Sequence, residues 1–524
     1  MGTNDSEDLE RPGSDDRRFR DVMTVTSIGG GGAAISETHI GVVFFVGDRA
    51  YKLKKPVDLG FLDFTTREAR ERALHQEARL NKRFAPDVYL GVLDVHDSGG
   101  KPCDHLLMMR RMPADRRLSD LVRAGAPVDD ALRAVARTLA SWHARAPRGP
   151  EISAEGTRDA LRDRWTQSFE QVGPFHGRVI DAGEAEEIRR RALDFLAGRE
   201  PLLSGRVNEG RVVDGHGDLL AGDIYALDDG PRILDCLEFD DRLRYLDGVD
   251  DAAFLAMDLE RLGHPGLAER FIGWYAEFAA DPAPPSLRHH YVAYRAFVRA
   301  KVACLRHDQG DEGAAAEAGT LTGMALRHLR AGAVGLILVG GLPGTGKTTL
   351  AGAIADRLGC TLLSSDRVRK ELAGLSPGDS AAAPYGKGIY TPEWDRRTYD
   401  ELAQRAERLL GLGETVVLDA SWTSRHDRDL IGEVGHRACA EFHPLRCMAD
   451  EQVTAGRLRD RAPSPSDADA SIARAMAATE DPWPEATTID TSGPLRDSLD
   501  QALTAIRPHG VAHVWHRRPR IPPD

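Results

Sequence analysis

The run GLPGTGKT at residues 341–348 combines glycines, a lysine and a hydroxyl side chain at a fixed spacing. Glycines let successive backbone N–H groups approach an anion, Lys347 can reach the outer phosphates of a nucleotide, and Thr348 can offer its hydroxyl to Mg²⁺. An apolar run at 334–340 precedes the loop and a helical pattern follows it, as a Walker A phosphate loop requires. The residues predicted to bind ATP here are Gly341, Leu342, Pro343, Gly344, Thr345, Gly346, Lys347, Thr348 and Thr349.

Two aspartates that follow neighbouring apolar runs extend this site. Asp419 comes directly after the run 416–418, where a carboxylate can hold Mg²⁺. Asp366 follows the run 361–364 and would lie at the carboxyl edge of a sheet, where open α/β sheets bind their ligands. We expect Asp366 to orient or deprotonate an acceptor hydroxyl and, with Lys347, to be catalytic. The alternative is that Asp366 caps the following helix.

Two arginines downstream complete the predicted nucleotide site. Arg457 and Arg461 are four residues apart and share one face of a predicted helix. They could close over the transferring phosphate as a lid, or they could form a solvated helical face.

A second group of acidic residues lies around a hairpin in the first half of the chain. The triplet HGD ends at Asp218, Asp223 follows five residues later, and Asp235 comes after a hairpin that turns at 228–230. At this spacing one aspartate can accept a hydroxyl proton while the other two hold Mg²⁺ against nucleotide phosphates. We predict Asp218 as the base and Asp223 and Asp235 as metal ligands. Acidic turn residues around a hairpin are the alternative.

Such a site also needs a strand lysine that grips phosphates and a helix glutamate that holds the lysine. Lys52 lies on the predicted strand 50–54, and Glu77 lies on the helix that follows. Lys54 is on the same strand face and is the alternative lysine. The alternative is that Lys52 and Lys54 are exposed lysines on an edge strand and bind no ligand.

The predicted elements divide the chain into two halves. A strand-rich segment is followed by a mostly helical one up to about residue 330, and strands then alternate with helices. The predicted fold class is therefore α+β followed by α/β: a bilobal protein-kinase-like domain and then a doubly wound P-loop NTPase domain. The predicted segments are a disordered tail at 1–21, the kinase-like domain at 22–308, a linker or helix at 309–332, the P-loop domain at 333–506 and a C-terminal tail at 507–524.

Composition restricts the classes of partner. The 524 residues carry a formal net charge of −13, which argues against a nucleic-acid binder. No apolar run approaches the ~20 residues needed to span a bilayer, and no hydrophobic signal segment opens the chain. The six cysteines are scattered without metal-ligand spacing. We expect a cytoplasmic protein without membrane or nucleic-acid partners.

Residues 333–505 resemble the P-loop kinase group that includes gluconate kinases, polynucleotide end kinases and zeta-toxin-like kinases. The phosphate loop, Ser365 with Asp366, and the run 419–421 carry this resemblance. It implies phosphorylation of a hydroxyl rather than motor-type ATP hydrolysis.

Residues 35–305 resemble the aminoglycoside phosphotransferase-like kinase superfamily, within it the branch fused to a P-loop domain. The HGD triplet and the runs 50–56 and 238–242 carry the likeness. It implies that Asp218 is the base and Asp235 the principal metal ligand. Asp223 departs from the superfamily, which has asparagine there, and the added negative charge would alter metal affinity and turnover.

Two phosphate-handling sites predict an ATP-dependent kinase with ATP and Mg²⁺ as cofactors, which transfers the γ-phosphoryl group to hydroxyl groups of small-molecule acceptors. No N/T-K-x-D guanine signature accompanies the phosphate loop, which favours ATP over GTP. Two alternatives stay open. One domain could be an ATP-binding regulator of the other, or the P-loop domain could phosphorylate nucleotide or polynucleotide ends. The acceptor and the oligomeric state are not predicted.

Overall fold

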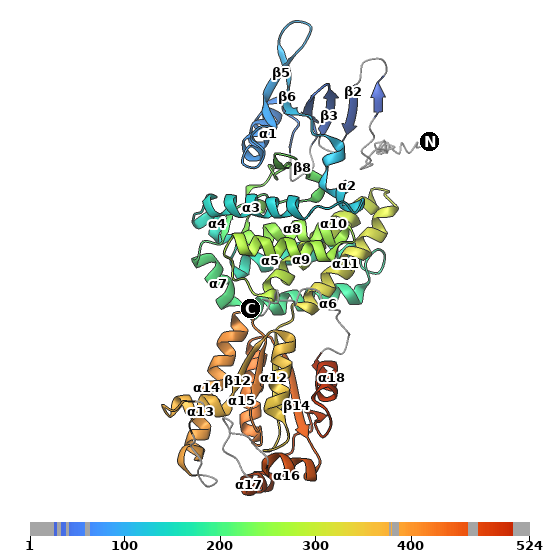
Figure 1. The fold of residues 1–524 in the computed structure, drawn as a ribbon. Coiled ribbons are helices and arrows are strands. Elements are labelled where there is room, and N and C mark those ends of the chain that lie inside the picture. The colour runs from blue at the N-terminus through green and yellow to red at the C-terminus, as the bar shows by residue number, and fades with distance from the viewer. Residues whose placement is uncertain are drawn as a thin grey trace, which may run out of the picture.

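The fold is taken from a computed structural model, which describes residues 26–28, 33–37, 41–57, 63–376, 379, 387–459 and 470–506. Figure 1 shows three tiers: a strand-rich lobe near the N-terminus, a helical body, and an α/β domain at the other end. The predicted fold class is confirmed, because the first two tiers form a bilobal kinase-like layout and the third is a doubly wound P-loop domain. Within these ranges no helix is long and apolar enough to cross a membrane.

An antiparallel six-stranded sheet forms the first lobe, in the order β1-β2-β3-β4-β6-β5. Its strands are β1 (Thr26–Ile28), β2 (Ala33–Glu37), β3 (Gly41–Val46), β4 (Arg49–Lys54), β5 (Tyr89–His96) and β6 (Pro102–Arg110). The predicted hairpin is β3–β4, and Gly47 adopts the positive φ that its turn requires. Helix α1 (Arg67–Asn81) begins at the cap Thr66 and packs on β5 and β6, with Glu77 on its buried face.

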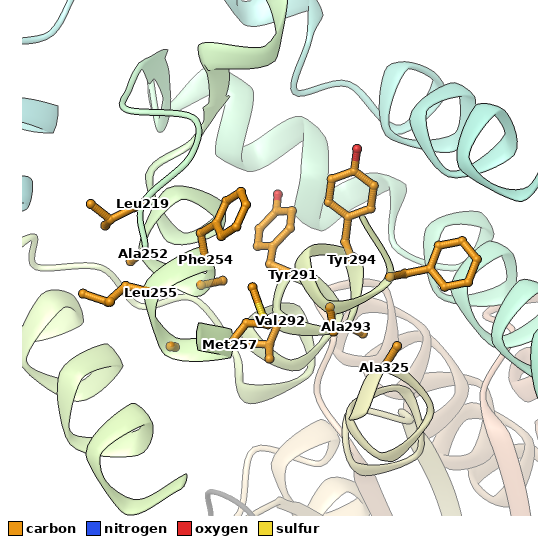
Figure 2. Close-up of a cluster of buried hydrophobic side chains, with 14 of the residues drawn as sticks. Leu219, Ala252, Phe254, Leu255, Met257, Tyr291, Val292, Ala293, Tyr294 and Ala325 are labelled. Atoms are coloured by element: carbon orange, nitrogen blue, oxygen red, sulfur yellow. The ribbon is translucent and has the colours of Figure 1, made fainter. Parts of the chain in front are cut away.

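The second tier is a body of helices with two small two-stranded sheets. Its helices are α2 (Leu118–Arg123), α3 (Asp129–Arg145), α4 (Pro150–Ala154), α5 (Arg158–Val172), α6 (Ala182–Ala197), α7 (Glu200–Asn208), α8 (Gly248–Arg261), α9 (Pro265–Phe278), α10 (Pro285–Asp308) and α11 (Gly313–Ala331). The short strands β7 (Val212–Asp214) and β10 (Tyr245–Asp247) pair, as do β8 (Ile224–Leu227) and β9 (Gly230–Ile233). Figure 2 shows the core of this body, where Phe254 and Met257 of α8 approach Tyr291 and Val292 of α10. Helix α11 adds Ala325 to the same core.

A parallel five-stranded sheet in the order β12-β13-β11-β14-β15 is the centre of the third tier. The strands are β11 (Gly335–Gly340), β12 (Thr361–Ser364), β13 (Val416–Asp419), β14 (Glu441–Met448) and β15 (Thr487–Asp490). The helices are α12 (Lys347–Leu358), α13 (Ser365–Leu372), α14 (Pro392–Gly411), α15 (Arg425–Arg437), α16 (Glu451–Arg459), α17 (Ala470–Ala478) and α18 (Leu495–Ile506). Along β11, Leu336 and Leu338 face one apolar cluster while Ile337 and Val339 face the other. Both faces of the sheet are thus covered, as in a buried parallel sheet.

The helical body holds the P-loop domain at the end of the sheet where the strands begin. Arg199 is buried and donates hydrogen bonds to the carbonyls of Gly198, at 2.9 Å, and of Ala438, at 2.5 Å. The hydroxyl of Ser286 donates to the carbonyl of Gly413 at 2.7 Å. A Cβ atom added to Gly198 would lie 2.7 Å from the carbonyl carbon of Ala438. Only glycine therefore permits this close approach of the two backbones.

Candidate functional site

The glycine-rich loop has the geometry of a phosphate-binding loop. Gly344 and Gly346 adopt φ values of 87° and 82°, and α12 starts immediately afterwards at Lys347. A Cβ on Gly344 would lie 2.8 Å from Thr454 on α16, so this glycine is required by both its conformation and its neighbour. The N–H groups at the start of α12 and its positive dipole end suit phosphate oxygens.

A cavity of about 390 Å³ lies beside this loop. It is lined by Gly344, Gly346, Lys347, Thr348, Thr349, Leu350, Arg457, Leu458, Thr491, Gly493, Leu495 and Ser498. Four of the predicted loop residues do not line it. Pro343 lines the neighbouring cavity, Gly341 packs against the carbonyl of Cys447, and the Thr345 hydroxyl donates to the carbonyl of Leu342 at 2.8 Å. Gly341, Leu342 and Thr345 thus hold the shape of the loop.

Arg457 lies over the loop. Its guanidinium donates to the carbonyl of Thr491 at 2.6 Å, and its other terminal nitrogen is buried with no hydrogen-bond partner among the residues that the structure describes. That nitrogen would be 3.3 Å from a Cβ on Gly346, so the side chain closes the end of the loop. The predicted partner Arg461 lies outside the described residues.

Asp419 ends β13 beside the phosphate loop and has the environment of a cation ligand. Its side chain is 3% exposed and its Oδ1 atom has no hydrogen-bond partner in the described part of the chain. Burial raises the pKa of Asp419, although Lys347 and the hydroxyls of Thr348 and Ser364 oppose this shift. A buried carboxylate oxygen without a donor, next to a threonine hydroxyl, fits Mg²⁺ or one of its water ligands.

A second cavity, of about 310 Å³, meets the first at Lys347, which lines both. Pro343, Asp366 and residues from α14, α15 and α17 form its other walls. Asp366 is in the first turn of α13, whereas Ser364 occupies the capping position. The capping role considered for Asp366 is therefore not what the structure shows, and its carboxylate lies in the wall of a cavity adjacent to the phosphate loop.

The first half of the chain brings Lys52 and Glu77 together. The Lys52 ammonium lies 2.6 Å from Glu77 Oε1 and 3.2 Å from Asp235 Oδ1. Lys54 is fully buried, lies 2.8 Å from Glu77 Oε2, and also contacts Glu238. Burial raises the pKa of Glu77, but the two lysines outweigh burial and hold it at about 2. Lys52 rather than Lys54 therefore faces the predicted metal ligand.

The HGD loop is fixed by a residue that the sequence patterns did not single out. Asp251 on α8 is fully buried and accepts hydrogen bonds from the backbone N–H groups of His216, at 2.7 Å, and Gly217, at 3.0 Å. It also pairs with the Nε2 atom of His143 at 3.0 Å. The available signal was a set of aspartates, Asp250, Asp251 and Asp258, within the apolar run of one helix, since buried carboxylates need partners.

The three predicted acidic residues of this half share one electrostatic environment. Burial raises the pKa of Asp218 to about 6, with Arg299 opposing the shift and Asp235 adding to it. Burial also raises the pKa of Asp223, and the neighbouring charges of Asp235 and Asp218 raise it further. Asp235 has a φ of 62°, unusual for a residue other than glycine. Asp218 and Asp223 are removed from water and lie near the charge of Asp235, and both effects favour the protonated form of these two carboxylates.

The acidic residues fit Mg²⁺ only together with further ligands. Nowhere among the residues placed by the structure do three His, Cys, Asp or Glu side chains gather as a ready metal site. Mg²⁺ commonly takes one or two carboxylates and completes its shell with phosphate oxygens and water. Asp235, which lies beside Lys52, could supply such a carboxylate next to nucleotide phosphates.

Comparison with known proteins places this architecture in a family. A profile described as an AAA domain matches residues 336–482. Uncharacterized protein Rv2004c of Mycobacterium tuberculosis and uncharacterized protein Mb2027c of Mycobacterium bovis are each 42% identical over 484 residues, which cover 92% of this chain and 95% of theirs.

Solved structures are similar to each half in turn. A sugar kinase from Janibacter sp. is 21% identical and covers 34% of this chain and 99% of its own, with a TM-score of 0.27. A choline/ethanolamine kinase family protein from Mesorhizobium loti is 14% identical and covers 57% and 92%, with a TM-score of 0.35. The chain joins a bilobal kinase-like fold to a P-loop domain. Because it is 42% identical to the mycobacterial proteins over nearly its full length, it belongs to their family.

Proposed function

We propose that the protein is an ATP-dependent phosphotransferase with two nucleotide sites, each transferring the γ-phosphoryl group of ATP to a hydroxyl of a small-molecule acceptor. One observation carries the proposal: Lys347 lines two cavities, one against the phosphate loop and one against Asp366. A phosphate held by Lys347 would thus face both a nucleotide and an acceptor, which is the positioning that phosphoryl transfer requires.

At the P-loop site, backbone N–H groups and Lys347 hold the phosphates of ATP. Mg²⁺, held by the Thr348 hydroxyl and Asp419, would neutralise charge on the phosphate oxygens. Asp366 orients the acceptor hydroxyl and takes its proton. The hydroxyl oxygen bonds to the γ-phosphorus as the bond to the β-phosphate oxygen breaks, and ADP leaves. Arg457 covers the loop end and reduces access of water.

At the first site, Lys52 positions the phosphates and Glu77 holds Lys52. Asp218 accepts the acceptor proton, and its pKa of about 6 leaves it ionised near neutral pH. Asp235 and Asp223 would be the carboxylates available to Mg²⁺. Asp223 is expected to weaken turnover here relative to the P-loop site, because burial and the charges of Asp235 and Asp218 raise its pKa and make its ionised, metal-binding form costly.

The test is transfer of label from [γ-³²P]ATP to a panel of hydroxylated metabolites by the full-length protein. We expect Lys347→Ala and Asp218→Ala each to remove a different set of products, and the double variant to remove all of them. An unchanged product pattern in the double variant would refute the proposal. So would the absence of transfer by the wild type.

Regulation of one domain by the other is the second candidate, favoured by the unusual Asp223. It predicts that the Lys347→Ala variant still binds ATP at the first site without forming any product there. A third candidate, phosphorylation of nucleotide or polynucleotide ends, predicts labelling of a 5′-hydroxyl oligonucleotide. The net charge of −13 argues against it.

A further inference from the structure

The acceptor cavity of the P-loop site has an acidic wall. Four aspartates line it, together with two cationic side chains, two tyrosines and several hydroxyl groups. The charged residues are Asp366, Asp395, Asp427, Asp481, Lys347 and Arg369. An acceptor must therefore match a surface that carries more negative than positive charge.

Neither cation is available to an anionic acceptor. Lys347 is directed to the phosphates of ATP in the proposed function. Arg369 lies 2.7 Å from Asp395, which neutralises its charge, and also donates to the carbonyl of Ile389 at 3.1 Å. The buried Nε–H of Arg369 has no acceptor among the described residues, and because its charge is already compensated by Asp395, a neutral oxygen such as a hydroxyl suits it. A carboxylate or phosphate on the acceptor would find no uncompensated partner among the described lining residues.

Asp427 is the carboxylate best placed to bind a cation. It is half-buried in the first turn of α15, and no lysine or arginine of the described ranges forms an ion pair with it. Burial raises its pKa, and so do the charges of Asp395 and Asp400, while Ser424 and His426 oppose them. The helix dipole favours an acidic residue at this position but leaves its carboxylate in the cavity wall.

Asp481 and Asp366 are the two remaining aspartates, and each has a different partner or proposed role. Asp481 is exposed and accepts the backbone N–H of Arg425 at 2.8 Å. Asp366 lies on α13 and is the proposed proton acceptor. Asp427, on α15 within the same 310 Å³ cavity, is thus left to bind a second group of the acceptor.

Resting on the proposed function of this site, we propose that its acceptor is a small hydroxylated ammonium compound, such as an amino sugar or amino alcohol, whose protonated amine binds Asp427. The phosphorylated hydroxyl faces Asp366 and Lys347, and a further hydroxyl accepts from Arg369. Sugar acids and nucleic-acid ends are excluded by the charge of the same wall.

The test compares matched acceptors in the full-length Asp218→Ala protein, which leaves only the P-loop site active. Glucosamine, glucose and gluconate are assayed for label transfer from ATP. We expect the amine to have the highest kcat/KM, and Asp427→Asn to reduce it roughly 10- to 100-fold while changing the value for glucose by less than about 3-fold. Asp429→Asn, an exposed aspartate on the same helix, should leave all three unchanged.

Two outcomes would overturn the inference. One is gluconate as the best acceptor, and the other is an equal loss for glucosamine and glucose in Asp427→Asn protein with an unaltered melting temperature. Either result leaves the kinase proposal in place, because transfer is still observed. A D427K variant distinguishes a lost contact from a folding defect. Reversal of the charge should move the preference towards gluconate, which a merely misfolded protein would not show. Transfer neither to these three acceptors nor to any member of the wider metabolite panel would instead refute the proposed function, and this inference with it.

Discussion

Replacement of Glu77 by glutamine should loosen the first lobe while leaving the P-loop domain intact. Glu77 is 1% exposed and is the shared counter-charge of Lys52 and Lys54. Its pKa falls from 4.5 to about 2 on folding. A shift of this size corresponds to about 3 kcal/mol of stabilisation at neutral pH. Glutamine keeps the shape of the side chain but leaves two buried lysines short of one negative charge, a change that is typically costly.

Hydrogen exchange read by mass spectrometry can measure this effect locally. A loss of about 3 kcal/mol should speed exchange of amides in β4 and α1 by roughly 100-fold, since 1.4 kcal/mol is a factor of ten. Peptides from β11 and β13 serve as an internal reference and should not change. Glu71→Gln on the same helix is the matched control, because Glu71 is 41% exposed and its effect should stay within about 0.5 kcal/mol.

The sign of the pH dependence gives a second measurement. The folded-state pKa of Glu77 is depressed, so its contribution is present above pH 4.5 and is lost as the pH falls towards 2. Over this pH interval, the protection of β4 and α1 against exchange should therefore decrease more in the wild type than in the Glu77→Gln variant. Equal protection of β4 and α1 in the wild type and the Glu77→Gln variant at pH 7 would refute the assignment of Glu77 as the buried counter-charge.

Three further predictions concern the two sites and their junction. In the Lys347→Ala background, the rate of transfer at the first site should fall as the pH drops below about 6, because Asp218 must lose its proton to act as a base; a flat profile down to pH 5 would contradict this role. Asp419→Asn should raise the Mg²⁺ concentration needed for half-maximal transfer at the P-loop site by about 10- to 100-fold, measured by Mg²⁺ titration with ATP saturating, and an unchanged requirement would exclude it as a ligand. Gly198→Val should destabilise the protein by about 1–3 kcal/mol in thermal unfolding through a clash with Ala438, whereas Gly205→Ala, with open space around it, should not destabilise it.

Local sequence patterns were sufficient to predict the structure wherever one short run of residues forms both the secondary-structure element and the site. The phosphate loop, its preceding strand and its following helix are contiguous, so their spacing alone predicted the turn and the helix start. The β3–β4 hairpin was predicted for the same reason. The choice between Lys52 and Lys54 was not decidable in this way, because it depends on Asp235, which lies 183 residues further along the chain.

Features that the fold assembles from distant segments could not be predicted from local sequence patterns. Asp251 supports the HGD loop from a helix that begins about thirty residues later, and only the burial of α8 explains why an aspartate there must be paired. The acceptor cavity draws its wall from α13, α14, α15 and α17, so its charge balance is a property of tertiary packing. Arg369 illustrates the difference: in the sequence it is one more basic residue on an amphipathic helix, yet in the fold its charge is compensated by Asp395.

The placement of the junction determines how the two sites can cooperate. Arg199 and Ser286 hold the P-loop domain by Ala438 and Gly413, which lie where the strands begin, whereas the phosphate loop and Asp419 lie where the strands end. The six residues of β11 separate these two ends by roughly 20 Å. The sheet lobe lies on the side of the helical body away from the P-loop domain (Figure 1), and the proposed first site is where Lys52 of this lobe contacts Asp235. With two active sites, as proposed, a product of one would therefore reach the other through solvent rather than through a shared cleft. Any coupling between them must pass through the helical body, where α8 carries Asp251 and packs on α10, the helix that bears Ser286 at the junction.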